Sequence, residues 1–369
     1  MKYYEFMDGT KVSALGMGNM RLPTKEDGSI DYQTGKAMID RAMAGGINYY
    51  DTAYIYHGGA SEAFLGQAMA DYPRDAYYLA TKYNKSNPDY RAEFAEQLHR
   101  MRTDYVDFYM FHGVQDDSVD FYLGCGALEY FDSLKREGTI RHLGVSVHCS
   151  PHTLARILDA YAWDFVQLQL NYYDWLYGDA RALHEVAVQH NIPIMVMEPV
   201  RGGNLATLTP EGDAMLKQSE PDKSIASWAF RWAVGLPNVA VVLSGMSTPE
   251  QVQDNLNTFA AYAPLTPEQE SLLLEACKLY RATVSVACTG CRYCCDDCPQ
   301  GLDIPHLLSV YNDMKMGGEW RVAFLNHLPE EKKPAACIGC GVCSGLCPQG
   351  FDIPSYLQEM AALGARFQG

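Results

Sequence analysis

The sequence predicts an α/β fold, a (β/α)8 TIM barrel, followed by a smaller and mostly α-helical domain. Two observations lead to this prediction. Short apolar segments alternate with amphipathic segments over most of the chain, and a cysteine motif then occurs twice near its end. We place the boundary near Arg281–Val286, so that residues 1–282 form the barrel and residues 283–369 form the second domain.

The predicted strands are short and apolar, which suits a parallel sheet that is covered by helices on both faces. They are Val12–Gly16, Asn48–Asp51, Tyr78–Thr81, Val106–Phe111, His142–Val147, Phe165–Leu170, Ile194–Met197 and Val239–Leu243. Amphipathic segments separate them, for example Gln33–Ala44, Ala63–Ala70, Arg91–Met101 and Ala180–His190. Eight strand–helix units in about 250 residues match a (β/α)8 barrel in number and length.

Turn and capping residues mark three further elements. Tyr3–Val12, with Asp8-Gly9 at its centre, predicts a hairpin that closes the barrel floor. Thr248 and Thr266 are each followed by Pro-Glu-Gln, which places Thr at the N-cap, Pro at N1 and Gln at N3 of a helix. The second of these helices is expected to be the last one before the C-terminal domain.

The C-terminal domain repeats one cysteine spacing. Each copy reads Cys-x-x-Cys-x-x-Cys-x-x-x-Cys-Pro-Gln-Gly-x-Asp-Ile-Pro, beginning at Cys288 and again at Cys337. This spacing is typical of ferredoxins with two [4Fe–4S] clusters, in which the fourth cysteine of each copy ligates the other cluster. We therefore assign one cluster to Cys288, Cys291, Cys294 and Cys347, and the other to Cys337, Cys340, Cys343 and Cys298.

Other uses of these cysteines fit the pattern less well. Zinc sites use four ligands in paired Cys-x-x-Cys units instead of runs of three cysteines followed by Cys-Pro. Disulfides need an oxidising compartment, and the N-terminus lacks the signal-peptide pattern that would direct the chain to one. Ile304–Leu328, between the two copies, has helical apolar spacing, so the domain resembles the α-helical ferredoxin type. Cys295 lies directly beside Cys294, which leaves open which of these two thiols is the ligand.

Composition excludes some classes of partner. A formal net charge of −16 argues against nucleic acid, which needs a basic face, and against anionic membranes. No apolar run has the length of a transmembrane segment. Beyond the eight proposed ligands, the chain contains Cys125, Cys149, Cys277 and Cys295. Scattered free thiols fit a reducing compartment, so we expect a cytoplasmic protein.

Four polar residues follow neighbouring strands of the predicted barrel, where catalytic residues of this fold lie. Asp51 and Tyr56 follow the second strand, Lys82 the third and His112 the fourth. An ammonium near a phenol lowers its pKa, and a carboxylate keeps that ammonium charged and oriented. With a histidine to orient the substrate oxygen, these residues predict a proton donor for a carbonyl that receives a hydride.

This arrangement resembles the aldo-keto reductase family. The segment from Asn48 to Tyr56, followed by Ser61-Glu62 and Leu65-Gly66, is similar to its second-strand signature. The resemblance covers roughly residues 1–280 and implies that Asp51, Tyr56, Lys82 and His112 are the catalytic tetrad. It also implies a nicotinamide site, with these cofactor-binding residues: Ser146, Gln167, Met197, Ser244, Gly245, Met246, Gln251 and Asn255.

Several positions depart from the family pattern. Val147 stands where the family usually has Asn, and Met197 stands where many members stack an aromatic ring on the nicotinamide. Gly245 and Gln251 stand where basic residues usually bind a 2′-phosphate. The cofactor can therefore be NADPH or NADH, with Arg201 as a candidate for the missing charge.

Electron counting leaves the functional link between the domains open. A nicotinamide delivers two electrons as a hydride, each cluster passes one, and no flavin signature is evident. Three roles for the clusters are therefore open. They can be structural or serve as a docking module, or they can exchange electrons with a partner protein. In the third case they receive electrons from another redox ligand in the barrel. We predict an oxidoreductase that acts on a small carbonyl or alcohol. The alternative is an electron-transfer protein whose barrel no longer performs hydride chemistry. A third class, a cluster-based redox sensor, has no support, because the sequence shows no DNA-binding or signalling segment.

Side chains at the predicted rim of the barrel are candidates for the substrate pocket. They are Arg21, Tyr54, Tyr172, Trp175, Glu198 and Arg201. Their mixture of aromatic and charged groups suits a sugar or a hydroxy acid.

Overall fold

The computed structural model describes residues 1–85, 87–284, 286, 288 and 290–367, and it divides into two compact units. The first unit comprises Met1–Val200 and Glu220–Leu274, and the second comprises Arg201–Ser219 and Glu275–Gly369. Residues 201–219 thus group with the second unit, although they lie inside the predicted barrel region. The predicted boundary segment includes residue 285, which lies outside the described residues.

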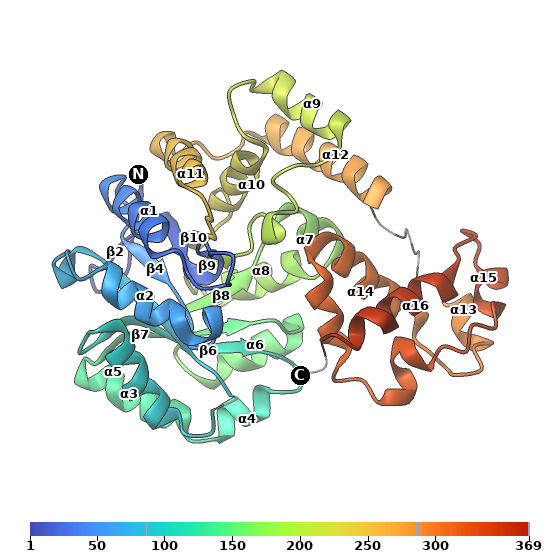
Figure 1. Cartoon of the computed structure of the whole chain (residues 1–369), viewed down its shortest axis with the longest axis horizontal. Coiled ribbons are helices and arrows are strands. Elements are labelled where there is room, and N and C mark those ends of the chain that lie inside the picture. Colours follow the sequence, from blue (N-terminus) through green and yellow to red (C-terminus); the bar gives the residue numbers. More distant parts are fainter. Residues whose placement is uncertain (86, 285, 287, 289, 368–369) are drawn as a thin grey trace. The chain divides into compact units, whose positions relative to one another are not determined.

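The predicted (β/α)8 barrel is confirmed in the first unit. Eight parallel strands close in the order β10-β3-β4-β5-β6-β7-β8-β9. Figure 1 shows strands of this barrel surrounded by helices. These strands are β3 (Leu15–Gly18), β4 (Tyr49–Asp51), β5 (Tyr78–Tyr83), β6 (Val106–Val114), β7 (Ile140–Val147), β8 (Phe165–Gln169), β9 (Ile194–Met197) and β10 (Val239–Ser244). Their carboxyl ends meet at one end of the barrel, where the fold places chemistry.

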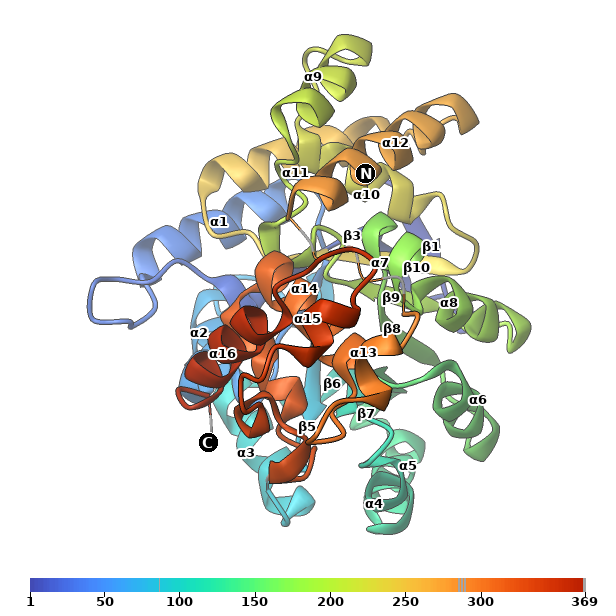
Figure 2. The same cartoon turned by 90° about the vertical axis from the view of Figure 1, so that its right-hand side faces the viewer.

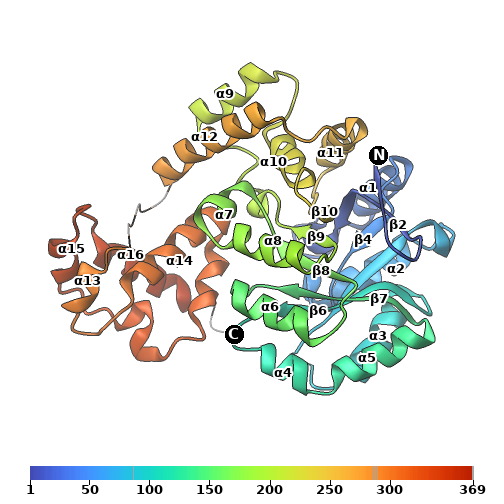
Figure 3. The same ribbon diagram turned by 180° about the vertical axis from the view of Figure 1, so that it is seen from behind.

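Helices cover the outside of this sheet, as the views from front and back show (Figures 1 and 3). They are α1 (Tyr32–Ala44), α2 (Ala60–Ala68), α3 (Tyr90–Met101), α4 (Val119–Gly124), α5 (Ala127–Glu137), α6 (Pro151–Ala160), α7 (Tyr172–Tyr177), α8 (Ala180–Gln189), α10 (Ile225–Val234) and α11 (Pro249–Ala261). Gly66 permits the close packing of α2 on α3, because a Cβ atom there would lie 2.3 Å from the Arg100 carbonyl oxygen.

An antiparallel hairpin precedes the barrel, as predicted. It consists of β1 (Tyr3–Glu5) and β2 (Lys11–Ser13), and it places Phe6 against Phe108 in the barrel core, with ring centres 5.5 Å apart. The predicted strand Val12–Gly16 in fact belongs to two elements. Val12 pairs with Tyr4 in the hairpin, whereas Leu15 pairs with Val242 in the barrel, and an unbroken apolar run hides this change of partner.

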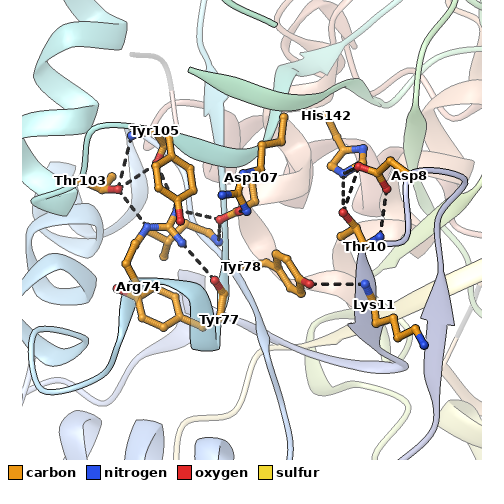
Figure 4. Close-up of polar contacts among 12 residues, drawn as sticks. Asp8, Thr10, Lys11, Arg74, Tyr77, Tyr78, Thr103, Tyr105, Asp107 and His142 are labelled. Carbon is orange, nitrogen blue, oxygen red and sulfur yellow. Dashed lines mark hydrogen bonds and ion pairs between the residues drawn. The ribbon is translucent and has the colours of Figure 1, made fainter. Parts of the chain in front are cut away.

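Polar contacts tie the hairpin turn and the amino-terminal strand ends together (Figure 4). His142 Nε2 lies 3.3 Å from both Thr10 Oγ1 and Asp8 Oδ2. The buried carboxylate of Asp107 on β6 accepts hydrogen bonds from Arg74 at 2.7 Å and Arg141 at 2.9 Å. These contacts lie at the barrel end opposite the strand carboxyl ends, so their role is to hold the fold.

Both predicted helix starts are present. Thr248 caps α11 by accepting a hydrogen bond from the Gln251 backbone N–H at 3.3 Å. Thr266 caps α12 (Pro267–Val284) through the Gln269 N–H, and the Gln269 side chain accepts from the Thr266 N–H in return. Within the part of the chain that the structure describes, every helix is too short or too polar to span a lipid bilayer.

The second unit is mostly helical, in agreement with the prediction (Figure 2). It contains α9 (Pro210–Ser219), the end of α12, α13 (Tyr293–Asp296), α14 (Ile304–Gly317), α15 (Val342–Leu346) and α16 (Ile353–Gly364). Apolar residues of α14 and α16 form its core together with Cys294 and Cys343. The loops that carry the cysteines are therefore held on a packed helical framework.

Candidate active site and cysteine cavities

The structure brings the four proposed catalytic residues together at the carboxyl ends of adjacent strands. Asp51 ends β4, Lys82 lies on β5, His112 lies on β6, and Tyr56 follows β4 in a short 3-10 turn. Lys82 Nζ lies 2.7 Å from Asp51 Oδ1 and donates a hydrogen bond to the Thr52 carbonyl oxygen at 2.6 Å. It also lies 5.0 Å from the centre of the Tyr56 ring.

The Lys82 ammonium is held in its charged form. Burial alone favours the neutral amine, but the neighbouring Asp51 carboxylate outweighs it and raises the pKa of Lys82. For Tyr56, burial raises the pKa above its ordinary value, although Lys82 acts in the opposite direction. The net direction differs from the sequence-based expectation, which took account of the Lys82 ammonium but not of the burial of the phenol. Tyr56 is therefore a protonated donor at neutral pH.

His112 also lies next to the Tyr56 ring, with ring centres 5.9 Å apart and planes at 80°. Burial, with a contribution from the Lys82 charge, lowers the pKa of His112 to about 3. Its Nδ1 atom is buried and has no hydrogen-bond partner among the described residues. The imidazole is therefore neutral and has a ring nitrogen available for another molecule.

A second layer of buried polar groups holds β5 behind Lys82. The Thr81 hydroxyl donates to Glu62 at 2.6 Å, and Gln97 Nε2 donates to the Lys82 carbonyl oxygen at 2.8 Å. Arg100 pairs with the same Glu62 carboxylate at 3.3 Å. Glu62 belongs to the predicted second-strand signature, whereas no sequence pattern identified Thr81 or Gln97 as residues of the site. Their placement depends on how α2 and α3 pack, which single-sequence patterns do not reveal.

Three residues proposed for the nicotinamide ring also meet. Ser146 on β7 is in register with Gln167 on β8, and both side chains point to the sulfur of Met197 on β9. The Ser146 Oγ–Sδ distance is 3.9 Å and the Gln167 Nε2–Sδ distance is 3.6 Å. Gln167 Oε1 is buried without a hydrogen-bond partner in the described residues. An acceptor of this kind fits the amide N–H of a nicotinamide carboxamide.

Hydrogen bonds hold the segment between β10 and α11, which contains the other residues predicted to bind the cofactor. Asn255 Nδ2 donates to Ser244 Oγ at 2.8 Å, and the Gln251 side chain accepts from the Ser247 N–H at 2.7 Å. Gly245 is exposed, whereas Met246 is buried. Gln251 is thus engaged in holding the loop, and the helix N-terminus that follows suits an anionic group.

The rim residues do not all face the tetrad. The Tyr54 hydroxyl donates to Glu96 at 2.8 Å on α3, and Trp175 packs against Trp232 with ring centres 5.3 Å apart. Arg201 lies in the second unit, where its guanidinium binds Asp313 at 2.5 Å and is 2% exposed. Tyr172 is fully buried. The Glu198 carboxylate raises the pKa of Tyr56. Arg21 lies beside Gly245.

The eight proposed cluster ligands line two separate cavities in the second unit. The lining of one includes Cys288, Cys291, Cys294 and Cys347. The lining of the other includes Cys298, Cys337, Cys340 and Cys343. Each cavity thus takes three thiols from one copy of the motif and the fourth from the other copy. Four cysteine thiolates are the donor set that a [4Fe–4S] cluster requires.

The two adjacent thiols of the first copy have different surroundings. Cys294 is among the residues that line the first cavity, whereas Cys295 is not. This arrangement favours Cys294 as the ligand.

Comparison with known protein families matches both parts of the chain. A model of the aldo/keto reductase family matches residues 14–276, and a model of a 4Fe-4S dicluster domain matches residues 287–351. The first match covers the barrel strands and the four converging residues. The second covers all eight cysteines proposed as cluster ligands.

Individual relatives cover the barrel. The uncharacterized oxidoreductase YqkF of Bacillus subtilis is 26% identical over 301 residues, which are 72% of this chain and 92% of YqkF. The NADH-specific methylglyoxal reductase of Escherichia coli is 27% identical, covering 66% of this chain and 89% of its own. The holo form of aldo-keto reductase AKR11C1 from Bacillus halodurans is 27% identical, with a TM-score of 0.60, covering 75% and 96% of the two chains.

Proposed function

Because this chain belongs to the aldo/keto reductase family, we propose that its barrel catalyses the nicotinamide-dependent reduction of a small carbonyl compound, or the reverse oxidation of an alcohol. The observation that carries this proposal is the buried ion pair of Lys82 and Asp51 beside the Tyr56 ring. A buried, charged lysine next to a phenol has a chemical use in proton transfer, and it is a costly arrangement for stability alone.

Each residue of the tetrad has a distinct task. A bound nicotinamide supplies the hydride that reaches the carbonyl carbon. Tyr56 donates its proton to the carbonyl oxygen as negative charge develops there, and the Lys82 ammonium stabilises the phenolate that remains. Asp51 keeps Lys82 charged and in place. Neutral His112 donates an N–H to the substrate oxygen and orients it.

The cofactor is NADPH or NADH. Gln167, Ser146 and Met197 would hold the nicotinamide, and Ser244, Gly245, Met246, Gln251 and Asn255 form the loop that would hold the phosphates. The absence of basic residues at 245 and 251 supports NADH, as does the name of the E. coli relative, an NADH-specific reductase.

The C-terminal domain would carry two [4Fe–4S] clusters, each held by three cysteines of one motif and one of the other. Bound clusters exchange single electrons. A protein that carries single electrons is therefore the proposed partner of this domain.

Two experiments test the proposal. Tyr56→Phe removes the donated proton while keeping the ring, so turnover with a panel of aldehydes should fall at least 100-fold with an unchanged circular dichroism spectrum. Unchanged turnover would rule out the mechanism. An anaerobic titration of the holoprotein with NADH and then NADPH, followed by cluster absorbance and electron paramagnetic resonance, tests the alternative. Failure of both nucleotides to bind would favour an electron-transfer protein without hydride chemistry.

A further inference from the structure

Asn312 on α14 places an amide side chain inside the second unit. The residue is only 6% exposed. Its neighbours on the same helix, including Leu308, Tyr311 and Met314, belong to the apolar core of the unit. Burying an amide costs free energy unless its polar groups form hydrogen bonds. The bonds that Asn312 makes therefore indicate why a polar side chain stands here.

Both polar groups of Asn312 bind the backbone of one residue, Val286. The Val286 N–H donates to Asn312 Oδ1 at 2.6 Å, and Asn312 Nδ2 donates to the Val286 carbonyl oxygen at 2.9 Å. This is the double exchange that a hydrogen-bonded pair of residues makes between two β-strands. Val286 is itself buried in the core. The amide thus holds a segment of backbone that lies 26 positions earlier in the chain.

The segment that Asn312 holds leads directly into a proposed cluster ligand. The Cys288 N–H donates to the same Val286 carbonyl oxygen at 2.7 Å, so this oxygen accepts from both Asn312 and the ligand residue. A slip of one residue in an extended segment would move Cys288 by about 3.3 Å. Site geometry must be held within about 0.5 Å. The two bonds to Val286 therefore fix the place where the first cysteine motif begins.

The helix that carries Asn312 also forms a wall of the first cavity. Pro305 and Leu308 of α14 line this cavity together with Cys288. Leu308 and Asn312 are four positions apart, so they lie on the same face of the helix. One face of α14 thus supplies both a wall of the cavity and the hydrogen bonds that hold the entry to it.

The second copy of the motif is held in a different way. The Cys337 N–H donates to the Pro334 carbonyl oxygen at 3.1 Å, at the end of the short 3-10 turn Pro334–Ala336. When the two copies are aligned at Cys288 and Cys337, the position of Asn312 corresponds to Ala361, whose side chain cannot form a hydrogen bond. A local turn of the backbone thus precedes the second motif, whereas a side chain from another element holds the start of the first.

We infer that Asn312 is a positioning residue for the first cluster, the one proposed for Cys288, Cys291, Cys294 and Cys347, and that the second cluster does not depend on it. The inference rests on the proposed presence of both clusters. A leucine of similar size would pack in this core without needing hydrogen bonds. The amide is therefore explained by the backbone that it holds.

The test uses Asn312→Leu in two full-length backgrounds, each designed to retain one cluster. Cys298→Ala/Cys337→Ala keeps the proposed ligands of the first cluster, and Cys288→Ala/Cys347→Ala keeps those of the second. Each protein is purified anaerobically, and iron release to a colorimetric chelator is followed together with the electron paramagnetic resonance of the reduced cluster. Asn312→Leu should speed iron release about ten-fold in the first background, as expected when support for a metal ligand is lost. It should leave release unchanged in the second.

Asn326→Ala is the matched control, because Asn326 Nδ2 also donates to a backbone carbonyl oxygen of this unit, that of Phe367 at 3.2 Å. It should leave iron release unchanged in both backgrounds. Faster release in both backgrounds with Asn312→Leu would mean a general loss of packing and would overturn the inference, as would unchanged release in both. If neither cysteine background retained iron, the proposed cluster assignment would fail first, and the inference with it.

Discussion

The Lys82 ammonium and the Asp51 carboxylate lie 2.7 Å apart, with side chains 0% and 4% exposed. When one partner of such a pair is removed, the other charge is left buried and uncompensated, which typically costs about 3–5 kcal/mol. The pair is thus a structural feature as well as a proposed catalytic one. The two roles can be separated by mutating one partner and then both.

We expect Asp51→Asn to lower both stability and turnover. The free energy of unfolding should fall by about 3 kcal/mol, because Lys82 stays buried without the carboxylate that compensates its charge. The double variant Asp51→Asn/Lys82→Met should regain most of this stability, since no buried charge remains. Its turnover should stay at least 100-fold below that of the unmodified protein. Urea unfolding and steady-state kinetics measure the two effects. Turnover that recovered together with stability would show that the pair has no chemical role.

The pH dependence of reduction should reflect a protonated Tyr56 and a neutral His112. Burial raises the pKa of Tyr56 and lowers that of His112 to about 3, so neither group changes charge between pH 5 and 8. We expect kcat/KM for carbonyl reduction to show no ionisation of either group in this range and to fall only at alkaline pH, as Tyr56 loses its proton. A limb near pH 6.5 that disappears in His112→Ala would contradict this assignment.

Periodicity in the sequence was enough to predict the barrel, because buried parallel strands leave short apolar runs that packed helices separate. It did not reveal that the apolar run is divided at Ala14, so that residues before it pair within the hairpin and residues after it pair with β10 in the barrel. Motif spacing also predicted that Asp51, Tyr56, Lys82 and His112 meet, because strand order fixes which carboxyl ends are neighbours. It could not show that Thr81 and Glu62 bond behind Lys82.

Long-range side-chain contacts account for the other differences. Arg201 looked like a residue of the barrel rim, but it binds Asp313 in the second unit, 112 positions away in the chain. Arg21 was placed with the substrate candidates because it follows the first strand. Its contact with Gly245 depends on β3 and β10 being neighbours in the closed barrel, and on a turn whose direction the sequence does not specify.

Glu93 on α3 should make the barrel less stable as the pH rises. Its side chain is fully buried, one oxygen accepts from the Asn84 N–H at 2.9 Å, and burial raises its pKa to about 7 from an ordinary 4.5. Between these values the folded state binds more protons than the unfolded state, so stability falls with rising pH, by about 3 kcal/mol in total.

Glu93→Gln should remove this loss, because the amide has no proton to release and keeps an acceptor for Asn84. We expect its urea midpoint to exceed that of the unmodified protein at pH 8 and to approach it at pH 5. Glu96→Gln is the control on the same helix, since contacts with Tyr54 and Arg100 lower the Glu96 pKa and place its titration below this window. Equal pH slopes in the unmodified protein and Glu93→Gln would refute the assignment.

The proposed crossed ligation of two clusters predicts a distinctive pattern in double variants. Cys347 lines the cavity of Cys288, and Cys298 lines the cavity of Cys337. If each cluster takes its fourth thiolate from the other motif, Cys288→Ala/Cys347→Ala removes two ligands of one cluster and leaves the other intact. Cys337→Ala/Cys347→Ala damages both clusters.

Iron and sulfide analysis of anaerobically purified protein should therefore show about half the cluster content in the first variant and almost none in the second. Cys295→Ala should retain both clusters, and the reverse pattern in the double variants would mean that each motif holds its own cluster.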